Sequence, residues 1–293
     1  MAENFQFDAK MVLRILRVKG TVILAVVTGI LFLLTLYSHG SNIRYKLELL
    51  IMRQSMFWGE LRKKLKQCEV EVIPKQESLI LPLYNSKEYK YAIIPKRPVS
   101  PKSRCLAVVI GMDGEIGSEA KLQNYYSDAC EIFGVDPVAS PNRGLLELIG
   151  GKFTHATIRM TNNVTTDSTL KKMENNTPKI PHINLKQFLV ETVGVKKILD
   201  WLSIDFGSEE INPFPIFLKG GVFDSLDVDV CQWNGRVHLK QTGPEGEKAF
   251  LNFLKASIRI KRYIFMNLKL QPEGVVTFYA INIESQRCIQ RYW

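Results

Sequence analysis

Residues 105–122 read CLAVVIGMDGEIGSEAKL, and this stretch decides the fold. Cys105 to Ile110 form a short, continuous apolar run that ends at a glycine, which is typical of a strand buried on both faces in a parallel sheet. Ser118 to Ala129 then carry a helical pattern of apolar residues. A buried strand followed closely by a helix predicts the first unit of an α/β sheet.

The same alternation continues along the rest of the chain. Short apolar segments that predict strands are separated by segments with helical periodicity, which favours a mostly parallel sheet. The further predicted strands are 131–135, 153–160, 198–204, 229–233, 263–270 and 275–283, and the clearest further helices are 145–149 and 245–256. The turn 271–274 predicts a C-terminal hairpin, which we expect to add an antiparallel strand at one edge of the sheet.

Thr21 to Tyr37 read TVILAVVTGILFLLTLY and contain no charged side chain. Roughly 17 to 25 apolar residues span a bilayer as a helix, so we expect one transmembrane signal anchor here. Basic residues within 1–20 favour a cytoplasmic N-terminus, and thus a type II single-pass protein of the endoplasmic reticulum or Golgi. A cleaved signal peptide, with small residues at 38–40, is the alternative.

The expected organisation is a basic tail (1–20), the anchor (21–37), a stem and linker (38–104) and one domain (105–293). The net charge is +10, but basic clusters such as 62–66 carry no aromatic interleaving, so we expect no nucleic-acid partner. The five cysteines form no CxxC pair, so a zinc site is not expected. In a lumen one or two disulfides could form, and their pairing is open.

Two predicted strand ends carry residues suited to a cofactor. In an open α/β sheet, ligands bind at the carboxyl ends of the strands. Gly111 and Gly114 would let the backbone approach a ligand closely, although the two could also serve only a tight turn. Asp136 ends the second strand, where a carboxylate can accept both hydroxyls of a ribose. Its alternative role is to cap a turn before Pro137.

A third strand end carries Asp205, followed by Glu209 and Glu210. Asp205 could be a helix N-cap with two acidic residues in the first turn. Polar residues at the ends of separate strands, in this order along the chain, are nevertheless the pattern expected of a nucleoside cofactor that lies across the sheet.

Together these segments resemble a known family. VVIGMDGEIGSEAKL (108–122), EIFGVDPV (131–138), ILDWLSIDFGSEE (198–210) and DVDVCQWNGRVHL (227–239) are similar in order and spacing to FkbM-type S-adenosylmethionine-dependent methyltransferases. The similarity is to the divergent membrane-anchored group of nematodes in particular, and it covers 105–293.

The resemblance implies a Rossmann-like, seven-stranded methyltransferase sheet with S-adenosyl-L-methionine as cofactor and no metal. It implies methylation of a small-molecule or glycan hydroxyl. The loop residues would hold the cofactor together with Asp136, and two acidic residues would lie near the reacting groups. The implied cofactor-binding residues are Gly111, Asp113, Gly114, Glu115 and Asp136, and the implied catalytic residues are Asp205 and Glu210.

Two alternatives stay open. Asp113 stands where relatives carry a second glycine, and Gly207-Ser208 replace their inner Glu-Gly, so a catalytically degenerate member of the fold is one. The other is a type II glycosyltransferase, in which Asp227-Val228-Asp229 would hold a metal and a sugar nucleotide. The remaining candidate, His238, lies on a predicted strand, where we expect a structural role.

Overall fold

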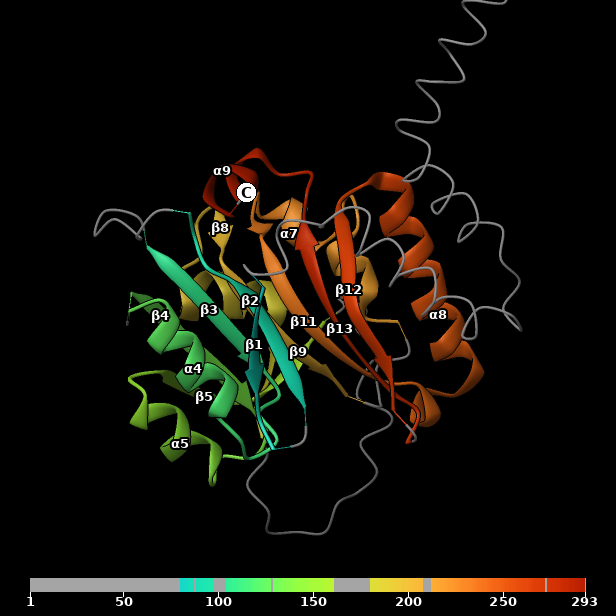
Figure 1. Ribbon diagram of the computed structural model, residues 1–293. Coiled ribbons are helices and arrows are strands. Elements are labelled where there is room, and N and C mark those ends of the chain that lie inside the picture. Colours follow the sequence, from blue (N-terminus) through green and yellow to red (C-terminus); the bar gives the residue numbers. More distant parts are fainter. Residues whose placement is uncertain are drawn as a thin grey trace, which may run out of the picture. The chain divides into compact units, whose positions relative to one another are not determined.

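The centre of the fold is a seven-stranded sheet with the order β12-β13-β11-β9-β3-β4-β5 (Figure 1). The structure is a computed structural model that describes residues 80–86, 88–96, 104–127, 129–160, 180–207, 212–271 and 273–292. The sheet strands are β3 (Cys105–Ile110), β4 (Cys130–Asp136), β5 (Lys152–His155), β9 (Trp201–Phe206), β11 (Gln232–His238), β12 (Tyr263–Leu270) and β13 (Val275–Asn282).

Six of the seven strands are parallel, and β13 alone runs against them. In chain order, the sheet matches the doubly wound order 3-2-1-4-5-6 with one strand inserted between the fifth and the sixth. The expected seven-stranded, mostly parallel sheet is therefore confirmed. The expected C-terminal antiparallel hairpin, β12 and β13, is also confirmed. Its place in the sheet differs from the expected one, because the antiparallel strand β13 pairs on both sides and the edge belongs to β12.

The two faces of this sheet differ in chemistry. One face is aromatic: Trp233 stacks on Phe217 with ring centroids 3.9 Å apart, and Phe253 and Phe265 pack around the same ring. The helical segments of the chain are α4 (Gly117–Tyr125), α5 (Asn142–Leu148), α6 (Leu185–Gln187), the π-helical η2 (Phe188–Val193), the 3-10 helix η3 (Phe214–Phe217), α7 (Val222–Ser225), α8 (Leu239–Ile260) and α9 (Gln286–Tyr292). Helices α8 and η3 cover the aromatic face.

The opposite face combines buried apolar side chains with polar ones and carries a hairpin. In Figure 1 this hairpin, β1 (Ile80–Tyr84) and β2 (Tyr89–Ile93), lies in front of the central strands. The side-chain amide of Asn234 exchanges two hydrogen bonds with the backbone of Tyr91, and that of Gln232 does the same with Ile93. Because both the amides and the backbone groups recur every two residues, β11 side chains pair the free edge of β2 as a neighbouring strand would.

The hairpin therefore belongs to the packed domain, although it lies within the expected stem and linker (38–104). Leu83 and Ile93 are almost fully buried in the core, and burial of such side chains stabilises by about 1.5–3 kcal/mol each. The domain thus begins no later than Ile80, and the expected boundary at 105 lies inside it. Prolines interrupt 67–104, and for this reason the sequence pattern there does not predict the hairpin.

Several local expectations are refined. The third predicted strand is divided into β5 and β6 (Thr157–Arg159), and further short strands are β7 (His182–Asn184), β8 (Ile198–Leu199) and β10 (Asp229–Val230). The helix expected over 245–256 extends to Ile260, and a kink at Gly243, where φ is +67°, separates it from the preceding turn. Two disulfides form, Cys105–Cys130 and Cys231–Cys288.

The predicted anchor (21–37) and basic tail (1–20) lie outside the described residues. Among the helices that the structure describes, none has the length and apolar character to cross a membrane.

Candidate functional site

The strand order reverses between β3 and β9, since the chain leaves β3 on one side towards β4 and returns on the other. In such sheets the ligand crevice lies at the carboxyl ends beside this reversal. A hollow of about 480 Å3, part of it open to solvent, lies there between the sheet and the hairpin. We call it the switch-point hollow. Its lining includes Gly111, Asp113, Glu115 and Asp205, four of the predicted site residues.

The loop between β3 and α4 (111–116), which we call the Gly111 loop, requires glycine at its first position. Gly111 has a φ of +82°, and a Cβ built there would lie 2.9 Å from the Cβ of Asp205. Its amide donates to Val135 O over 3.0 Å, which holds the loop against β4. A side chain at 111 would therefore be strained and would push the ends of β3 and β9 apart.

Asp113 also has a left-handed backbone, with a φ of +51°. A non-glycine residue pays on the order of 1 kcal/mol or more for this conformation. The backbone of the second glycine position is thus retained, while the residue there carries a carboxylate. Gly114, with a φ of +72°, does not line the hollow, and its amide donates to Asn142 Oδ1 over 3.0 Å.

Asp136 is buried and does not line the hollow. One carboxylate oxygen accepts from Met112 N over 2.8 Å, and the other accepts from Val138 N over 2.6 Å. The carboxylate thereby fixes the Gly111 loop to the end of β4. This is a positioning role, and the expected contact of Asp136 with a ribose stays a prediction.

The hairpin closes the hollow from above through two contacts with the loop and the following helix. Glu115 accepts hydrogen bonds from both the amide and the hydroxyl of Ser86. Asn85 Oδ1 accepts from Ser118 N over 2.7 Å, so a side chain from the hairpin satisfies one of the free amides at the start of α4. Glu115 therefore ties the loop to the hairpin.

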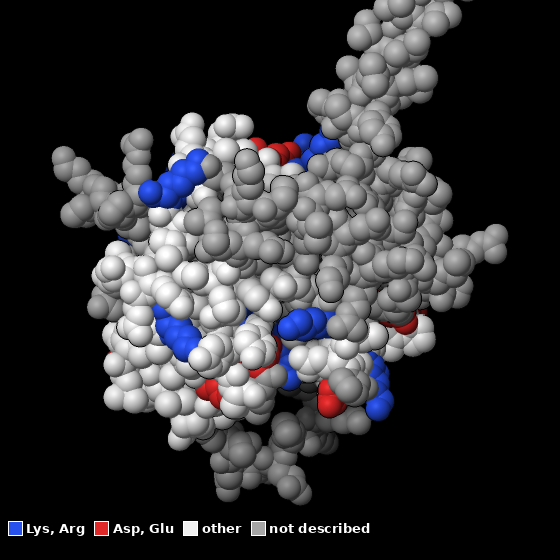
Figure 2. All heavy atoms as spheres, in the orientation of Figure 1, with Lys and Arg blue, Asp and Glu red and all other residues white. Residues whose placement is uncertain are grey.

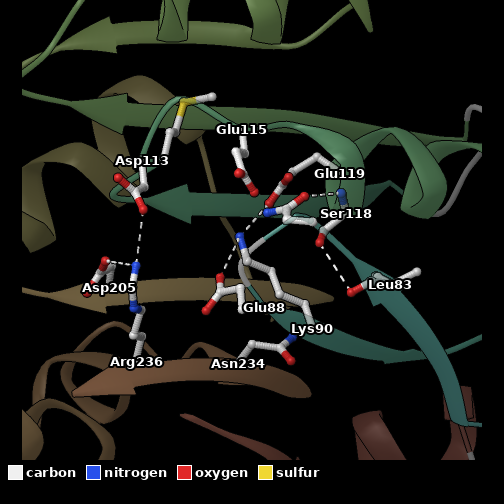
Figure 3. A network of polar contacts seen from close by, with 12 residues as sticks. Leu83, Glu88, Lys90, Asp113, Glu115, Ser118, Glu119, Asp205, Asn234 and Arg236 are labelled. Carbon is white, nitrogen blue, oxygen red and sulfur yellow. Dashed lines mark hydrogen bonds and ion pairs between the residues drawn. The ribbon is translucent and has the colours of Figure 1, made fainter. Parts of the chain in front are cut away.

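Charged residues face each other across the hollow (Figure 3). Arg236 lies between two carboxylates, with Nη1 3.3 Å from Asp113 Oδ2 and 3.2 Å from Asp205 Oδ2. The other oxygen of Asp205 lies 2.8 Å from His238 Nε2. Since a carboxylate only accepts, His238 donates through Nε2, and in the neutral imidazole Nδ1 is then the nitrogen that carries the lone pair. This is the arrangement of a general base with an orienting carboxylate.

A second charged group comes from the hairpin. Lys90 Nζ lies 2.8 Å from Glu119 Oε1 and 3.7 Å from Glu88 Oε1. Burial alone would lower the pKa of Lys90, but the two carboxylates outweigh it and raise that pKa. For Glu88 burial is the dominant effect and raises the pKa, whereas the positive charges of Lys90 and Arg236 act to lower it. Lys90 and Glu88 both line the hollow.

The structure thus brings together four of the seven predicted site residues. Glu210 lies outside the described residues. Lys90 and Arg236 are contributors that the sequence did not indicate, and His238, for which we expected a structural role, contacts Asp205. In β11, polar residues at 232, 234, 236 and 238 alternate with residues that face the aromatic core, and this period of two was the available signal for Arg236 and His238.

The D-x-D sequence does not form a metal site. Asp227 is bound by Lys197 and by Arg287, and these hydrogen bonds, that of Lys197 first, lower its pKa to about 2. Asp229 faces Arg287 and Ser285. These residues precede β11, at the amino ends of the parallel strands, so they lie at the edge opposite the hollow. No group of three metal-binding side chains occurs among the described residues.

Comparisons with known proteins are sparse. No protein-family profile matches the chain, and no curated protein matches it. Solved structures with some likeness include a putative O-methyltransferase from Klebsiella pneumoniae, with 12% identity over 61% of this chain and 73% of that chain and a TM-score of 0.36. Fibrillarin of Aeropyrum pernix with natively bound S-adenosyl-L-methionine has 12% identity, coverage of 63% and 69%, and a TM-score of 0.32.

The Methanococcus jannaschii fibrillarin pre-rRNA processing protein has 9% identity, coverage of 69% and 82%, and a TM-score of 0.35. Likenesses of this size carry no argument about the chemistry of this chain. The chemistry of the domain is therefore inferred from the strand order and from the residues of the switch-point hollow.

Proposed function

We propose that the domain binds S-adenosyl-L-methionine in the switch-point hollow and methylates a hydroxyl group of a small molecule or glycan. The observation that carries this proposal is the contact of 2.8 Å between His238 Nε2 and Asp205 Oδ1. Asp205 lines the hollow beside the Gly111 loop. Its contact with His238 puts a proton acceptor next to the place where the strand order predicts a ligand.

The residues present fit this cofactor. Arg236 Nε is buried and has no hydrogen-bond partner among the described residues, so it is a donor available to a carboxylate in the hollow. Glu88, on the hairpin side, also lines the hollow, with Lys90 Nζ 3.7 Å from its Oε1, and its carboxylate can accept from a second ammonium group. Gly111 keeps the loop close to β9 without a side chain between them. An amino-acid moiety, which carries both charges, matches this set.

The bound cofactor supplies a methyl group on a sulfonium, so that its C–S bond breaks as a C–O bond forms and S-adenosylhomocysteine is left. The chain's residues position the acceptor and take its proton. His238 Nδ1 accepts the hydroxyl proton as the bond to carbon forms. Asp205 holds the imidazole in the tautomer that leaves Nδ1 unprotonated and stabilises the imidazolium that results.

Cofactor binding is tested by calorimetric titration of the detergent-solubilised full chain with S-adenosylmethionine and S-adenosylhomocysteine. Gly111→Ala should weaken binding at least tenfold, because its Cβ meets Asp205. Gly144→Ala is the matched control, since a Cβ at 144 meets nothing within 4 Å. Absence of binding by the unaltered chain would sink the proposal.

The role of His238 is tested separately. His238→Gln should retain cofactor binding and abolish methyl transfer, whereas His182→Gln, which changes an exposed histidine on β7, should alter neither. Transfer that persists in His238→Gln would show that the base lies elsewhere.

A second function, a protein that keeps the fold without transfer, is favoured by one observation. Asp113 carries a side chain in a glycine-like conformation, and Arg236 already pairs with it inside the hollow. These ion pairs could occupy the cofactor's place. The same titration distinguishes the two functions, because only the methyltransferase binds cofactor.

We also propose that residues 21–37 anchor the chain as a type II membrane protein with the domain in the lumen of the endoplasmic reticulum or Golgi. The disulfides Cys105–Cys130 and Cys231–Cys288 support this, because disulfides persist in oxidising compartments. Protease treatment of intact microsomes should leave the domain undigested. Digestion without detergent would place it in the cytosol.

A further inference from the structure

A second hollow opens beside the first, over β13 and β12. We call it the side groove. It encloses about 350 Å3, part of it open to solvent. Glu88, Tyr89, Thr277 and Phe278 line both hollows, so the two are continuous. The other residues of its lining are Tyr91, Asn267, Lys269 and Gln271.

Four polar residues that pair with one another across neighbouring strands form a row from the switch-point hollow to the side groove. Asp205 pairs with Arg236, and Arg236 pairs with Thr277. Thr277 in turn pairs with Lys269. Residues directly opposite one another on neighbouring strands share a face, and neighbouring strands lie about 4.8 Å apart. A ligand in the side groove therefore extends along this row towards Asp205.

His238 lies on the same face, two residues beyond Arg236 on β11. The proposed base thus contacts Asp205, the residue at the end of the row that the side groove approaches. This geometry suits an acceptor that lies in the side groove with one hydroxyl directed into the switch-point hollow.

The side groove combines aromatic rings with short-range hydrogen-bonding groups. Tyr89 is 54% exposed, with Lys269 Nζ 5.2 Å from the centre of its ring and the Tyr84 ring centre 5.7 Å away, so a ligand would meet the part of the ring that these two leave open. Donors and acceptors come from the Gln271 amide, the Thr277 hydroxyl and the Lys269 ammonium group. A pyranose ring has apolar C–H faces that pack on an aromatic ring and a rim of hydroxyl groups that need such partners.

The charges of the groove are balanced. One acidic residue, Glu88 on the hairpin, and one basic residue, Lys269 on β12, line it. Figure 2 shows basic and acidic side chains intermingled along the lower part of this face, not gathered into an area of one sign. A polyanion would be repelled by Glu88, and a wholly apolar ligand would leave the polar lining unpaired.

We propose that the side groove binds a pyranose ring, stacked on Tyr89, and that a sugar hydroxyl is the methyl acceptor. The assignment as acceptor rests on the proposed methyltransferase function, whereas the sugar binding stands on the groove alone.

The test is saturation-transfer NMR and calorimetric titration of the detergent-solubilised full chain, saturated with S-adenosylhomocysteine. The probes are the methyl glycosides of glucose, galactose, mannose and glucuronic acid, with cyclohexanediol as a ring that lacks the hydroxyl rim. At least one glycoside should bind more tightly than cyclohexanediol. Tyr89→Ala should weaken that binding about tenfold or more, and Tyr89→Phe should restore it.

Tyr125→Ala, which removes an exposed tyrosine on α4, is the matched control and should leave sugar binding unchanged. The proposal that the side groove binds a sugar would be overturned if no glycoside binds, or if Tyr89→Ala leaves glycoside binding unchanged. Cofactor binding is measured on the same samples without sugar. Cofactor binding without sugar binding would reject the sugar-binding proposal alone. Sugar binding without cofactor binding would support the sugar-binding proposal and reject the methyltransferase function.

Discussion

The ammonium group of Lys90 lies 2.8 Å from Oε1 of Glu119, and both side chains are almost completely buried. Lys90 belongs to the hairpin and Glu119 to the first turn of α4. The pair therefore joins the hairpin, which covers the switch-point hollow, to the helix that follows the Gly111 loop. Ser118 adds a second link, because its hydroxyl donates to Leu83 O over 3.2 Å (Figure 3). The hairpin is thus held by buried polar contacts as well as by apolar packing.

Breaking this pair should be costly. Lys90→Met leaves the Glu119 carboxylate buried without its partner, and such changes destabilise by about 3–5 kcal/mol. The double variant Lys90→Met/Glu119→Leu should recover much of this loss, because no buried charge remains. Urea unfolding measures both, with Glu147→Gln on the exposed side of α5 as the control. A double variant as unstable as Lys90→Met would contradict the explanation.

The amide of Asn234 should hold the hairpin in register. Asn234→Leu removes two hydrogen bonds to Tyr91, so we expect a loss of about 1–3 kcal/mol and faster amide exchange at Tyr91 and Ile93. Asn124→Leu, on the exposed side of α4, should change neither quantity. Unchanged exchange at Tyr91 in the first variant would mean that apolar packing alone positions β2.

Acid should weaken the contact between β3 and β4. Hydrogen bonds from Arg104, then from Lys152, lower the pKa of Glu131 from 4.5 to about 2, against the opposing effect of burial. A carboxyl with a lowered pKa stabilises the fold above its unfolded value, and this contribution is lost as the pH falls from about 4.5 towards 2. Because Glu131 is 40% exposed, solvent screening limits the effect to about 0.2–1 kcal/mol.

Glu131→Gln should therefore lose less stability than the unaltered chain between these two pH values. Guanidinium unfolding at both, repeated in 1 M salt, measures this, and the salt should reduce the difference. Equal acid dependence of the two proteins would show that the ion pair contributes nothing.

Reduction of Cys231–Cys288 should loosen α9. The bond closes a sequence separation of 57 residues, and disulfides typically contribute about 2–4 kcal/mol. The chain-entropy account predicts a smaller loss for Cys105→Ser/Cys130→Ser, whose separation is 25. Thermal unfolding of the two double variants compares them. Asp200 should retain part of the α9 contact, since Tyr292 Oη lies 2.6 Å from its Oδ1.

Manganese should not stabilise the domain through the D-x-D sequence. Asp227 and Asp229 already pair with Arg287, which would have to be displaced by a metal. Thermal unfolding with and without manganese should give the same midpoint for the unaltered chain and for Asp229→Ala. A shift that Asp229→Ala abolishes would revive the glycosyltransferase alternative.

Much of the sheet follows from local pattern. Cys105 to Ile110 predicted β3 with the bounds that the structure has, because a strand buried on both faces must be apolar throughout. Tyr263 to Leu270 predicted β12 equally well, since a hairpin turn follows it. The position of β13 inside the sheet was not predictable in this way, because strand order depends on pairings between distant segments.

The candidate site likewise has features that follow from local sequence and features that depend on tertiary packing. The sequence by itself determined the glycine loop at 111 and the acidic residues that end the strands, since turn chemistry and strand termini are local properties. Only the tertiary structure decided that Asp136 supports the loop from behind, that Asp205 meets His238, and that Lys90 reaches Glu119 across the hairpin. Those contacts join residues 24 to 33 positions apart, and a pairing at that range is set by how the strands and the hairpin pack together.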